Sequence, residues 1–293
     1  MTLKNKDFHG YPLPVILSIG ELVVDVTIVP QTSLRADDDT PARITIGGGG
    51  QAANFCAWAA ALGERARLIA RLGDDDNGRH LVAEIEGVGV EVCAVWASEP
   101  TGVIAVLVGP NGERSMATQH GAGIGLRSED LRDEWFQGVG LIHVPAYSLF
   151  LDPLRSAARA AIEGVRRSQG LLSIDLSSVA GIKEYGTRRM TSEIEQLKPD
   201  LLFANEAEST ALKVPLEKLA EVAVLKLGAA GCRVMGRTIP APPVVEVDAT
   251  GAGDAFAAAF CLSYLNGATP IDAAQRAVSV ASTAVTQYGA RPR

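Results

Sequence analysis

The chain has 293 residues, of which 47% are hydrophobic and 21% are charged, and its formal net charge is −7. This length suits one large α/β domain with room for a small appendage, and the composition is that of an ordinary globular protein. The negative charge argues against nucleic acid or an anionic membrane as the main partner. It does not exclude a nucleotide, because a phosphate site is local.

No apolar run in the sequence is long enough to span a bilayer, and residues 1–10 are polar and carry no signal core. The four cysteines are scattered and form no C-x-x-C pair. Cys56 and Cys261 fall in apolar runs that favour helices, which predicts buried free thiols and a reducing compartment. We therefore expect a cytoplasmic protein.

The N-terminal part of the chain predicts a buried strand followed by a carboxylate. Residues 15–20 form a short apolar run that ends in a glycine, as buried strands often do. Asp25 follows among β-branched residues, where a buried carboxylate needs a partner. The hydroxyls of a sugar would serve, and an exposed carboxylate at the rim of a sheet is the alternative.

Two parts of the chain predict exposed strands. Residues 27–46 alternate apolar and polar side chains, as exposed strands do, and residues 101–108 and 113–118 flank a hairpin-like turn at 109–112. We expect these segments to form a small β-sheet beside the main domain.

Four consecutive glycines, Gly47 to Gly50, precede an alanine-rich run that predicts a helix over 55–62. A glycine loop at that place lets a ligand approach the backbone closely, and Asn54 offers a donor and an acceptor suited to a polyol. The alternative interpretation is a flexible hinge.

Two other polar groups favour structural interpretations. The acids at 74–76 stand at the start of the next helix, where they cap the helix more often than they bind metal. His143 lies inside the apolar run 141–146, which predicts a core histidine and not a base.

From residue 152 onward, helices alternate with short apolar strands. Helices are predicted over 152–168 and 187–196, and strands over 171–176, 201–204 and 222–227. This alternation indicates a parallel sheet covered on both faces, in which ligands bind beyond the carboxyl ends of the strands.

Polar residues stand at those strand ends: Asp175, Asn205 with Glu208, and Lys226. Asn205 and Glu208 offer oxygen ligands suited to Mg²⁺, and a helix cap with a capping-box glutamate is the alternative. Lys226 closes an apolar strand, where an ammonium is costly to bury unless an anion awaits it.

Residues 250–265 combine small residues, a carboxylate and a predicted helix. Gly251, Ala252 and Gly253 lie at or just before the N-terminus of an alanine-rich helix, so an anion can reach the free N–H groups there. Asp254 places a carboxylate in the same spot, as phosphoryl transfer to a hydroxyl requires. An aspartate that only caps the helix is the alternative.

Taken together, these segments resemble the ribokinase-like (PfkB) carbohydrate kinases over residues 20–290. Residues 248–256 (DATGAGDAF) resemble the C-terminal signature of that family, and Gly49, Gly50 and Asn54 resemble its first signature. The resemblance implies a three-layer α/β/α sandwich with a mostly parallel central sheet, formed by one domain over 1–293. It also implies a β-sheet lid built from about 26–46 and 101–119.

The resemblance also implies a set of site residues. Asp254 would be the catalytic base, and the backbone of Gly251, Ala252 and Gly253 the anion hole. Substrate would be bound by Asp25, Gly49, Gly50, Asn54 and, from the lid, Arg114. ATP would be bound by Lys226, Gly228, Gly231 and Thr250, and Mg²⁺ by Asn205 and Glu208 through water. The segment 284–290 resembles one that borders adenine and a monovalent-cation (K⁺) site.

The expected function is ATP-dependent phosphorylation of a primary hydroxyl on a monosaccharide or sugar acid of the ribose, fructose or 2-keto-3-deoxygluconate type. A nucleoside kinase for adenosine or pseudouridine is the alternative within the fold, and a non-catalytic sugar-binding regulator is the third hypothesis. A dinucleotide enzyme is disfavoured, because Gly47 to Gly50 lack the G-x-G-x-x-G spacing. The exposed strand edges of a lid also predict a homodimer formed through the lids.

Overall fold

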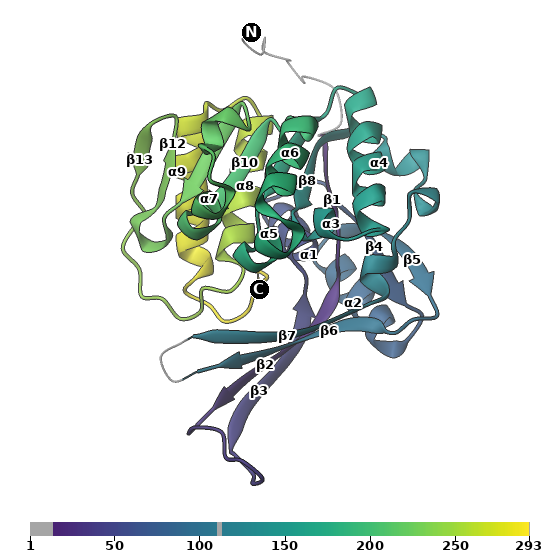
Figure 1. Ribbon diagram of the computed structural model, residues 1–293, viewed down its shortest axis with the longest axis vertical. Coiled ribbons are helices and arrows are strands. Elements are labelled where there is room, and N and C mark those ends of the chain that lie inside the picture. The colour runs from purple at the N-terminus through teal and green to yellow at the C-terminus, as the bar shows by residue number, and fades with distance from the viewer. Residues whose placement is uncertain (1–13, 110–112, 293) are drawn as a thin grey trace.

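The computed structural model describes residues 14–109 and 113–292 (Figure 1). Within these residues, nine strands form a central sheet in the order β13-β12-β11-β10-β9-β8-β1-β4-β5. Every neighbouring pair from β11 to β5 is parallel, and the hairpin β12–β13 is added antiparallel at one edge. The predicted mostly parallel sheet is confirmed, whereas the edge hairpin was not predicted.

The parallel strands are β1 (Val15–Ile19), β4 (Ala66–Gly73), β5 (Val90–Ala97), β8 (Val139–Pro145), β9 (Leu171–Asp175), β10 (Leu201–Asn205) and β11 (Val222–Lys226); the edge hairpin is β12 (Cys232–Val234) and β13 (Arg237–Ile239). The helices are α1 (Gln51–Ala61), α2 (Asp76–Gly87), α3 (Tyr147–Phe150), α4 (Leu154–Arg167), α5 (Val179–Tyr185), α6 (Thr187–Leu197), α7 (Glu206–Leu212), α8 (Ala252–Leu265) and α9 (Pro270–Ala284).

Two hydrophobic clusters cover the two faces of the central sheet. One cluster holds buried side chains of α1, α2, α8 and α9, and the other holds those of α3 to α7. The inner strands, such as β1, β8 and β9, therefore bury side chains on both faces, which is why they read as continuous apolar runs in the sequence. The three-layer α/β/α prediction is confirmed.

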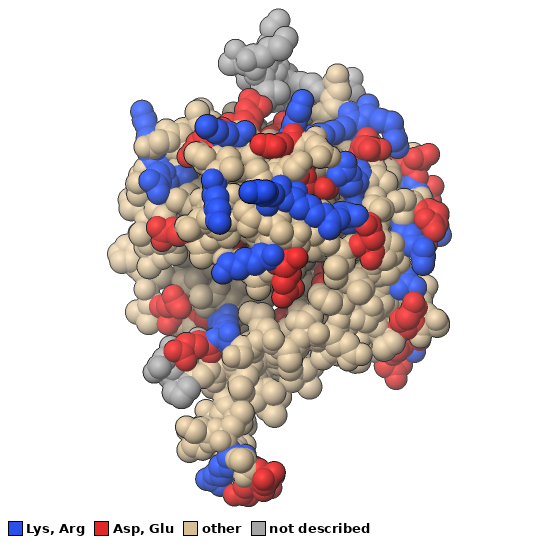
Figure 2. All heavy atoms as spheres, in the orientation of Figure 1, with Lys and Arg blue, Asp and Glu red and all other residues tan. Residues whose placement is uncertain are grey.

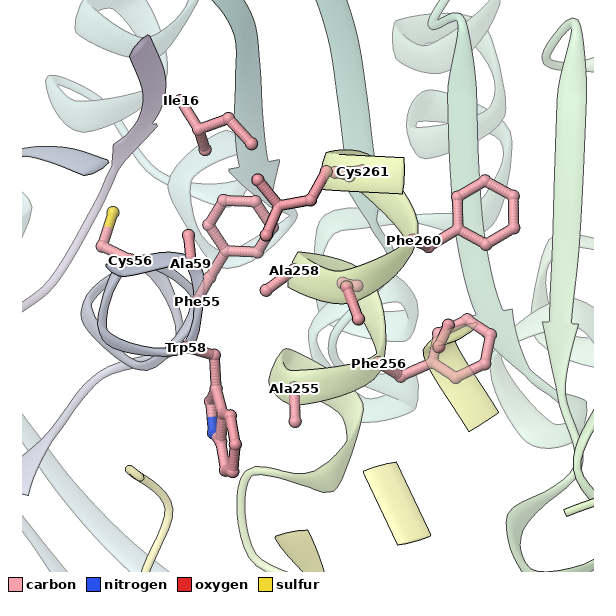
Figure 3. Close-up of a cluster of buried hydrophobic side chains, with 14 of the residues drawn as sticks. Ile16, Phe55, Cys56, Trp58, Ala59, Ala255, Phe256, Ala258, Phe260 and Cys261 are labelled. Carbon is pink, nitrogen blue, oxygen red and sulfur yellow. The ribbon is translucent and has the colours of Figure 1, made fainter. Parts of the chain in front are cut away.

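Helices α1 and α8 lie side by side on one face of the sheet (Figure 3). Their contact is made by fully buried side chains, among them Phe55 and Ala258, and many of these residues are alanines that allow the helix backbones to approach closely. Trp58 Nε1 also donates to the carbonyl of Ala290 at 2.9 Å. This packing brings the N-terminal ends of α1 and α8 together although they are 200 residues apart.

A second sheet of four described strands extends from the main body (Figure 1). We call it the small sheet; its strands are β2 (Val23–Pro30), β3 (Ala42–Gly49), β6 (Thr101–Val108) and β7 (Arg114–Gly121), in the order β3-β2-β6-β7. It corresponds to the predicted exposed strands, and the turn predicted at 109–112 lies partly outside the described residues. No helix among the described residues is both long and apolar enough to cross a membrane.

The glycine run differs from its prediction. Gly47 to Gly49 form the end of strand β3, and only Gly50 stands between that strand and helix α1. The predicted loop is therefore wrong, because the strand continues as a hydrogen-bonded partner of β2 as far as Gly49.

Candidate active site

The N-terminus of α8 is open to an anion. Gly251 is the N-cap residue with φ 74°, and a Cβ at this position would come within 2.6 Å of Ala290 Cα, so only glycine fits. No side chain caps the helix; the Ala252 N–H donates to the Ala249 carbonyl at 3.3 Å, and the Gly253 N–H in the first turn points toward an incoming anion. Asp254 is the third residue of the helix and not its cap, so the capping alternative is wrong.

The carboxylate of Asp254 is buried and contacts Asn54. Asn54 Nδ2 donates to Asp254 Oδ2 at 3.0 Å, and both residues are less than 9% exposed. Burial is the main cause that raises the pKa of Asp254 to about 7; the hydrogen bond from Asn54 offsets part of this rise, and the charge of Asp175 adds to it. A carboxyl with that pKa can take up a proton near neutral pH. The two sequence signatures thus converge on one spot.

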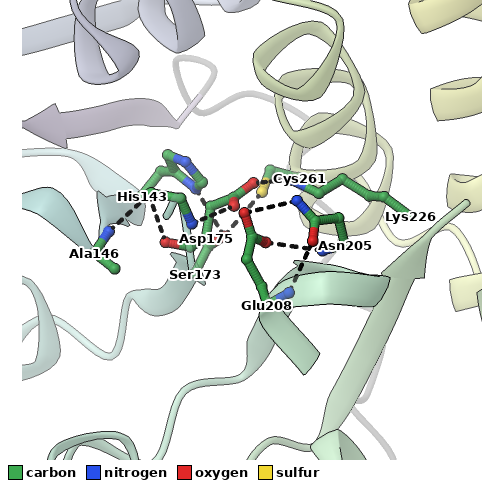
Figure 4. A network of polar contacts seen from close by, with 9 residues as sticks. His143, Ala146, Ser173, Asp175, Asn205, Glu208, Lys226 and Cys261 are labelled. Atoms are coloured by element: carbon green, nitrogen blue, oxygen red, sulfur yellow. Dashed lines mark hydrogen bonds and ion pairs between the residues drawn. The ribbon is translucent and has the colours of Figure 1, made fainter. Parts of the chain in front are cut away.

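Lys226 lies beside the first turn of α8, in the network drawn in Figure 4. Lys226 Nζ donates to Asp175 Oδ2 at 2.5 Å, and a Cβ at Gly253 would be 3.5 Å from the same Nζ. Burial by itself lowers the pKa of Lys226, but the charges of Asp175 and Glu208 outweigh burial and raise it. The ammonium therefore stays charged beside the N-terminus of α8.

Asn205 and Glu208 form a capping box at the start of α7. Asn205 Oδ1 accepts from the Glu208 N–H at 2.9 Å, and Glu208 Oε2 accepts from the Asn205 N–H at 2.8 Å. The capping alternative is therefore observed. Burial and the nearby charge of Asp175 raise the pKa of Glu208. Glu208 is 4% exposed, and it faces the Lys226 network (Figure 4).

Two of the glycines that the sequence singled out make room for protein atoms. A Cβ at Gly49 would be 2.5 Å from Asp25 Cγ, and a Cβ at Gly50, whose φ is 99°, would be 2.8 Å from the Glu21 carbonyl carbon. Among the described residues, Asp25 Oδ1 has no hydrogen-bond partner. Burial raises the pKa of Asp25, and the charge of Arg291 offsets part of this rise. An unsatisfied buried oxygen is suited to a ligand hydroxyl.

Arg114 and Thr250 both contact Asp248, just before the N-terminus of α8. Asp248 Oδ1 accepts from Arg114 Nη2 at 2.5 Å and from the Thr250 N–H at 2.9 Å, and Oδ2 accepts from the Gly289 N–H at 3.0 Å. Arg114 therefore ties strand β7 of the small sheet to the loop that carries the anion hole. Arg114 is thus an exposed arginine that forms an ion pair with Asp248.

The segment after Lys226 makes a tight turn. Gly228 and Gly231 both have positive φ values, 57° and 93°, and the Leu227 N–H donates to the Gly231 carbonyl at 2.8 Å. A Cβ at Gly231 would be 2.7 Å from the Ala241 nitrogen, so this position excludes side chains. The N–H groups of Ala230 and Gly231 donate within the turn, at 3.1 and 2.9 Å, so the N–H groups that could meet a phosphate are those of Gly228 and Ala229 at its start.

Three residues at the site were not assigned to it from the sequence. Asp175 ends a strand and was noticed only as such, Asp248 was noticed only as part of the signature, and Arg291 carried no local signal. Arg291 Nε donates to Asn54 Oδ1 at 3.2 Å from near the C-terminus. His143 is a core residue as predicted: it is fully buried and stacked on Phe55 at 3.9 Å, and burial lowers its pKa to about 3.

The helix starts predicted to be capped by acids are confirmed. Asp75 is the N-cap of α2 and accepts from the Gly78 N–H at 2.8 Å, while Asp74 and Asp76 pair with Arg79. All four cysteines are buried free thiols.

The site thus combines an open helix N-terminus, a buried carboxyl with a pKa near neutrality and a charged ammonium. The N–H groups and the ammonium can stabilise an anionic phosphoryl group, and the carboxylate can accept a proton from a hydroxyl. This is the equipment for phosphoryl transfer to an alcohol.

Known proteins agree with this chemistry. The family model of the pfkB family carbohydrate kinases matches residues 14–293. The chain is 29% identical to an ATP-dependent ribose-1-phosphate kinase of Halopiger xanaduensis, with 94% of this chain and 93% of the relative covered. It is 30% identical to a 2-dehydro-3-deoxygluconokinase of Thermoproteus tenax, with 94% and 89% covered.

A solved structure agrees over nearly the same span. The adenosine kinase of Sinorhizobium meliloti superposes with a TM-score of 0.85 at 25% identity, over 96% of each chain. The match over residues 14–293, together with the converged signatures, leads to one conclusion: this chain belongs to the pfkB family of carbohydrate kinases and is a phosphotransferase that acts on an alcohol group.

Proposed function

We propose that this enzyme transfers the γ-phosphate of ATP to a primary hydroxyl of a monosaccharide or sugar acid. The observation that carries the proposal is the 3.0 Å contact between Asn54 and Asp254 at the open N-terminus of α8, with Lys226 beside it. A polyol-binding amide, a base and a phosphate site share one place in this arrangement. The four free thiols fit a reducing, cytosolic setting.

In the proposed mechanism, Asp25 and Asn54 bind hydroxyls of the acceptor, and Asp254 accepts the proton of the reacting hydroxyl. That oxygen forms a bond to the γ-phosphorus while the bond to the bridging oxygen of ADP breaks. The N–H groups of 251–253 and the ammonium of Lys226 stabilise the charge on the transferred group. The turn at Gly228–Gly231 and the hydroxyl of Thr250 bind the nucleotide phosphates.

The residues present fit a magnesium ion held through water. Each carboxylate oxygen of Glu208 accepts one hydrogen bond from Asn205, at 2.8 Å, and retains a lone pair for a bound water. When bound, Mg²⁺ neutralises charge on the nucleotide phosphates. Segment 284–290 is the one expected to border a monovalent-cation (K⁺) site. Within it, the carbonyl oxygen of Val285 already accepts hydrogen bonds from the N–H groups of Val247 and Asp248.

A panel of acceptors tests the proposal. Ribose, fructose, 2-keto-3-deoxygluconate, adenosine and pseudouridine are each offered with ATP and Mg²⁺, and ADP release is measured by a coupled assay. We expect the highest kcat/KM with a sugar or sugar acid. Absence of ADP release with every acceptor, despite thermal stabilisation by one of them, would instead support a sugar-binding regulator.

A nucleoside kinase is the second candidate, favoured by the superposition with adenosine kinase. It shares the base and the anion hole and differs in the acceptor pocket. The same panel separates the two, because a nucleoside kinase would turn over adenosine or pseudouridine faster than any free sugar.

We also propose that the small sheet covers the acceptor and pairs two subunits. The strand register aligns an apolar row on the face opposite Asp25: Ile46 and Ile44 on β3, Val26 and Ile28 on β2, Ala105 and Leu107 on β6. Ile46 is 73% exposed and Ile44 57%. Figure 2 shows few charged side chains on this sheet between its tip and the body. Such a surface favours association.

Replacing Ile46 by Lys tests the dimer. We expect sedimentation velocity to give a dimer for the wild type and a monomer for Ile46→Lys, because a charge in an apolar interface is costly to desolvate. The control is Leu151→Lys on the body, a residue that is 50% exposed and should leave the assembly unchanged. A monomeric wild type would contradict this part of the proposal.

A further inference from the structure

The side chain of Arg291 lies buried where three elements meet. It is 9% exposed, and its guanidinium donates to three acceptors: Glu84 Oε1 on α2 at 3.0 Å, the Gly49 carbonyl on β3 at 3.0 Å, and Asn54 Oδ1 on α1 at 3.2 Å. These acceptors lie more than 200 residues away along the chain. A planar guanidinium with its donors in a fixed fork is suited to hold several groups in one geometry.

The contact with Asn54 fixes the orientation of that side chain. A carboxamide has one accepting end and one donating end. In the observed orientation Oδ1 faces the guanidinium of Arg291, and Nδ2 faces the carboxylate of Asp254. A flip would turn the amide oxygen toward a carboxylate and the NH₂ group toward a cation, and both contacts would be repulsive. Arg291 therefore favours the orientation that gives Asp254 a donor.

We infer that Arg291 is a positioning residue for the reaction, because it holds the Asn54 amide that aims the carboxylate of Asp254 at the acceptor hydroxyl. Arg291 acts through Asn54 and need not touch substrate. The inference deepens the proposed function and rests on it.

Gly48 supplies an independent way to disturb this contact. A Cβ at Gly48 would be 2.6 Å from Arg291 Cζ, and its three nearest atoms all belong to that guanidinium. Gly48→Ala should therefore push the guanidinium aside and leave its charge in the protein. At Gly47 a Cβ would have nothing within 4 Å, which makes Gly47→Ala the matched control on the same strand.

The groups that face Asp254 limit the alternative explanations. They are Asn54 and Gln51 from α1, Asp175 from β9 and Lys226 from β11. None of them is altered in Gly48→Ala. A changed protonation of Asp254 in that variant would therefore come through the orientation of Asn54.

The experiment measures kcat, KM for each substrate and the pH profile of kcat/KM in Arg291→Gln, Arg291→Lys, Gly48→Ala and Gly47→Ala. In Arg291→Gln, Arg291→Lys and Gly48→Ala we expect kcat to fall roughly ten- to a hundredfold. The acid limb of the pH profile of kcat/KM should move to higher pH, and KM for ATP should stay unchanged. Arg291→Lys keeps the charge but loses the fork, so it should not rescue. Gly47→Ala should keep the wild-type pH profile.

Two further variants and a direct titration make the outcome decisive. Arg67→Gln removes another buried arginine, which pairs with Glu91 at 2.7 Å far from the site, and should lower thermal stability without moving the pH profile. The ¹³C carboxyl signal of Asp254, assigned with Asp254→Asn, should titrate at higher pH in Gly48→Ala than in Gly47→Ala. Glu84→Gln should act in the same direction and more weakly.

The inference is overturned if Gly48→Ala and Arg291→Gln keep the wild-type kcat and pH profile in an active enzyme, or if Arg291→Lys restores both. Failure of the proposed function looks different, since the wild type itself would then release no ADP with any acceptor. The carboxyl titration still decides the inference in that case, because an unchanged Asp254 signal in Gly48→Ala would refute it.

Discussion

Replacing Asp254 by Asn is expected to lower kcat by about 10² to 10⁴-fold and to leave substrate binding largely intact. The amide has nearly the shape of the carboxylate but cannot accept the proton of the acceptor hydroxyl. Since Asp254 is 8% exposed, no bulk water replaces it as a base. Steady-state kinetics with the best acceptor of the panel, together with calorimetric binding of that acceptor, measure both quantities.

Asp272→Asn is the matched control for this variant. Asp272 also stands at the third position of a helix, α9, but it is exposed and only contacts its N-cap Thr269. We expect it to keep the wild-type kcat. An Asp254→Asn enzyme with near wild-type turnover would remove Asp254 from the role of base.

The same carboxyl predicts how activity and stability depend on pH. Its pKa of about 7 in the folded protein lies above the ordinary value of 3.8, so wild-type kcat/KM should rise with pH through about 7. The contribution of this carboxyl to folding stability changes with pH in the opposite direction. The folded state binds the proton more tightly than the unfolded state does, so stability from this group declines as pH rises from about 4 to 7. Asp254→Asn should therefore gain thermal stability relative to wild type above pH 7.

Replacing Lys226 by Met is expected to have the largest effect on stability. Asp175 is 1% exposed and pairs with Lys226 Nζ at 2.5 Å, so the variant leaves a carboxylate buried without its cation. Breaking such a pair costs about 3–5 kcal/mol of unfolding free energy. Nucleotide affinity should fall as well, because the ammonium beside Gly253 is lost. Denaturant unfolding and ATP binding measure the two effects.

A second variant separates the effect of the unpaired buried carboxylate from that of losing the lysine side chain. The double variant Lys226→Met with Asp175→Asn should recover most of the unfolding free energy, because the buried charge is then removed. Arg79→Met is the control: it removes solvent-exposed ion pairs with Asp74 and Asp76, and should leave the unfolding free energy nearly unchanged. If Lys226→Met and Arg79→Met lowered the unfolding free energy by the same amount, this expectation would be contradicted.

The sequence alone predicted the layers of the fold and the chemistry at one helix end. The strands appear as apolar runs because both faces of the central sheet are covered, and helix α8 begins where small residues give way to an alanine-rich run. Local residue order contains that information, since propensity and burial act on neighbouring residues. For the same reason Asp254 could be placed at an open helix N-terminus.

The tertiary structure decided which side chains meet. Nothing local indicates that Asn54 orients Asp254, that Asp175 neutralises Lys226, or that Arg291 reaches Asn54, because these partners lie between 51 and 237 residues apart along the chain. The glycine run was predicted as a loop because its tertiary neighbours cannot be seen in the sequence. Gly48 and Gly49 have no side chain because Arg291 and Asp25 occupy the space beside them. Such contacts depend on how helices pack against the sheet, and only packing in three dimensions fixes them.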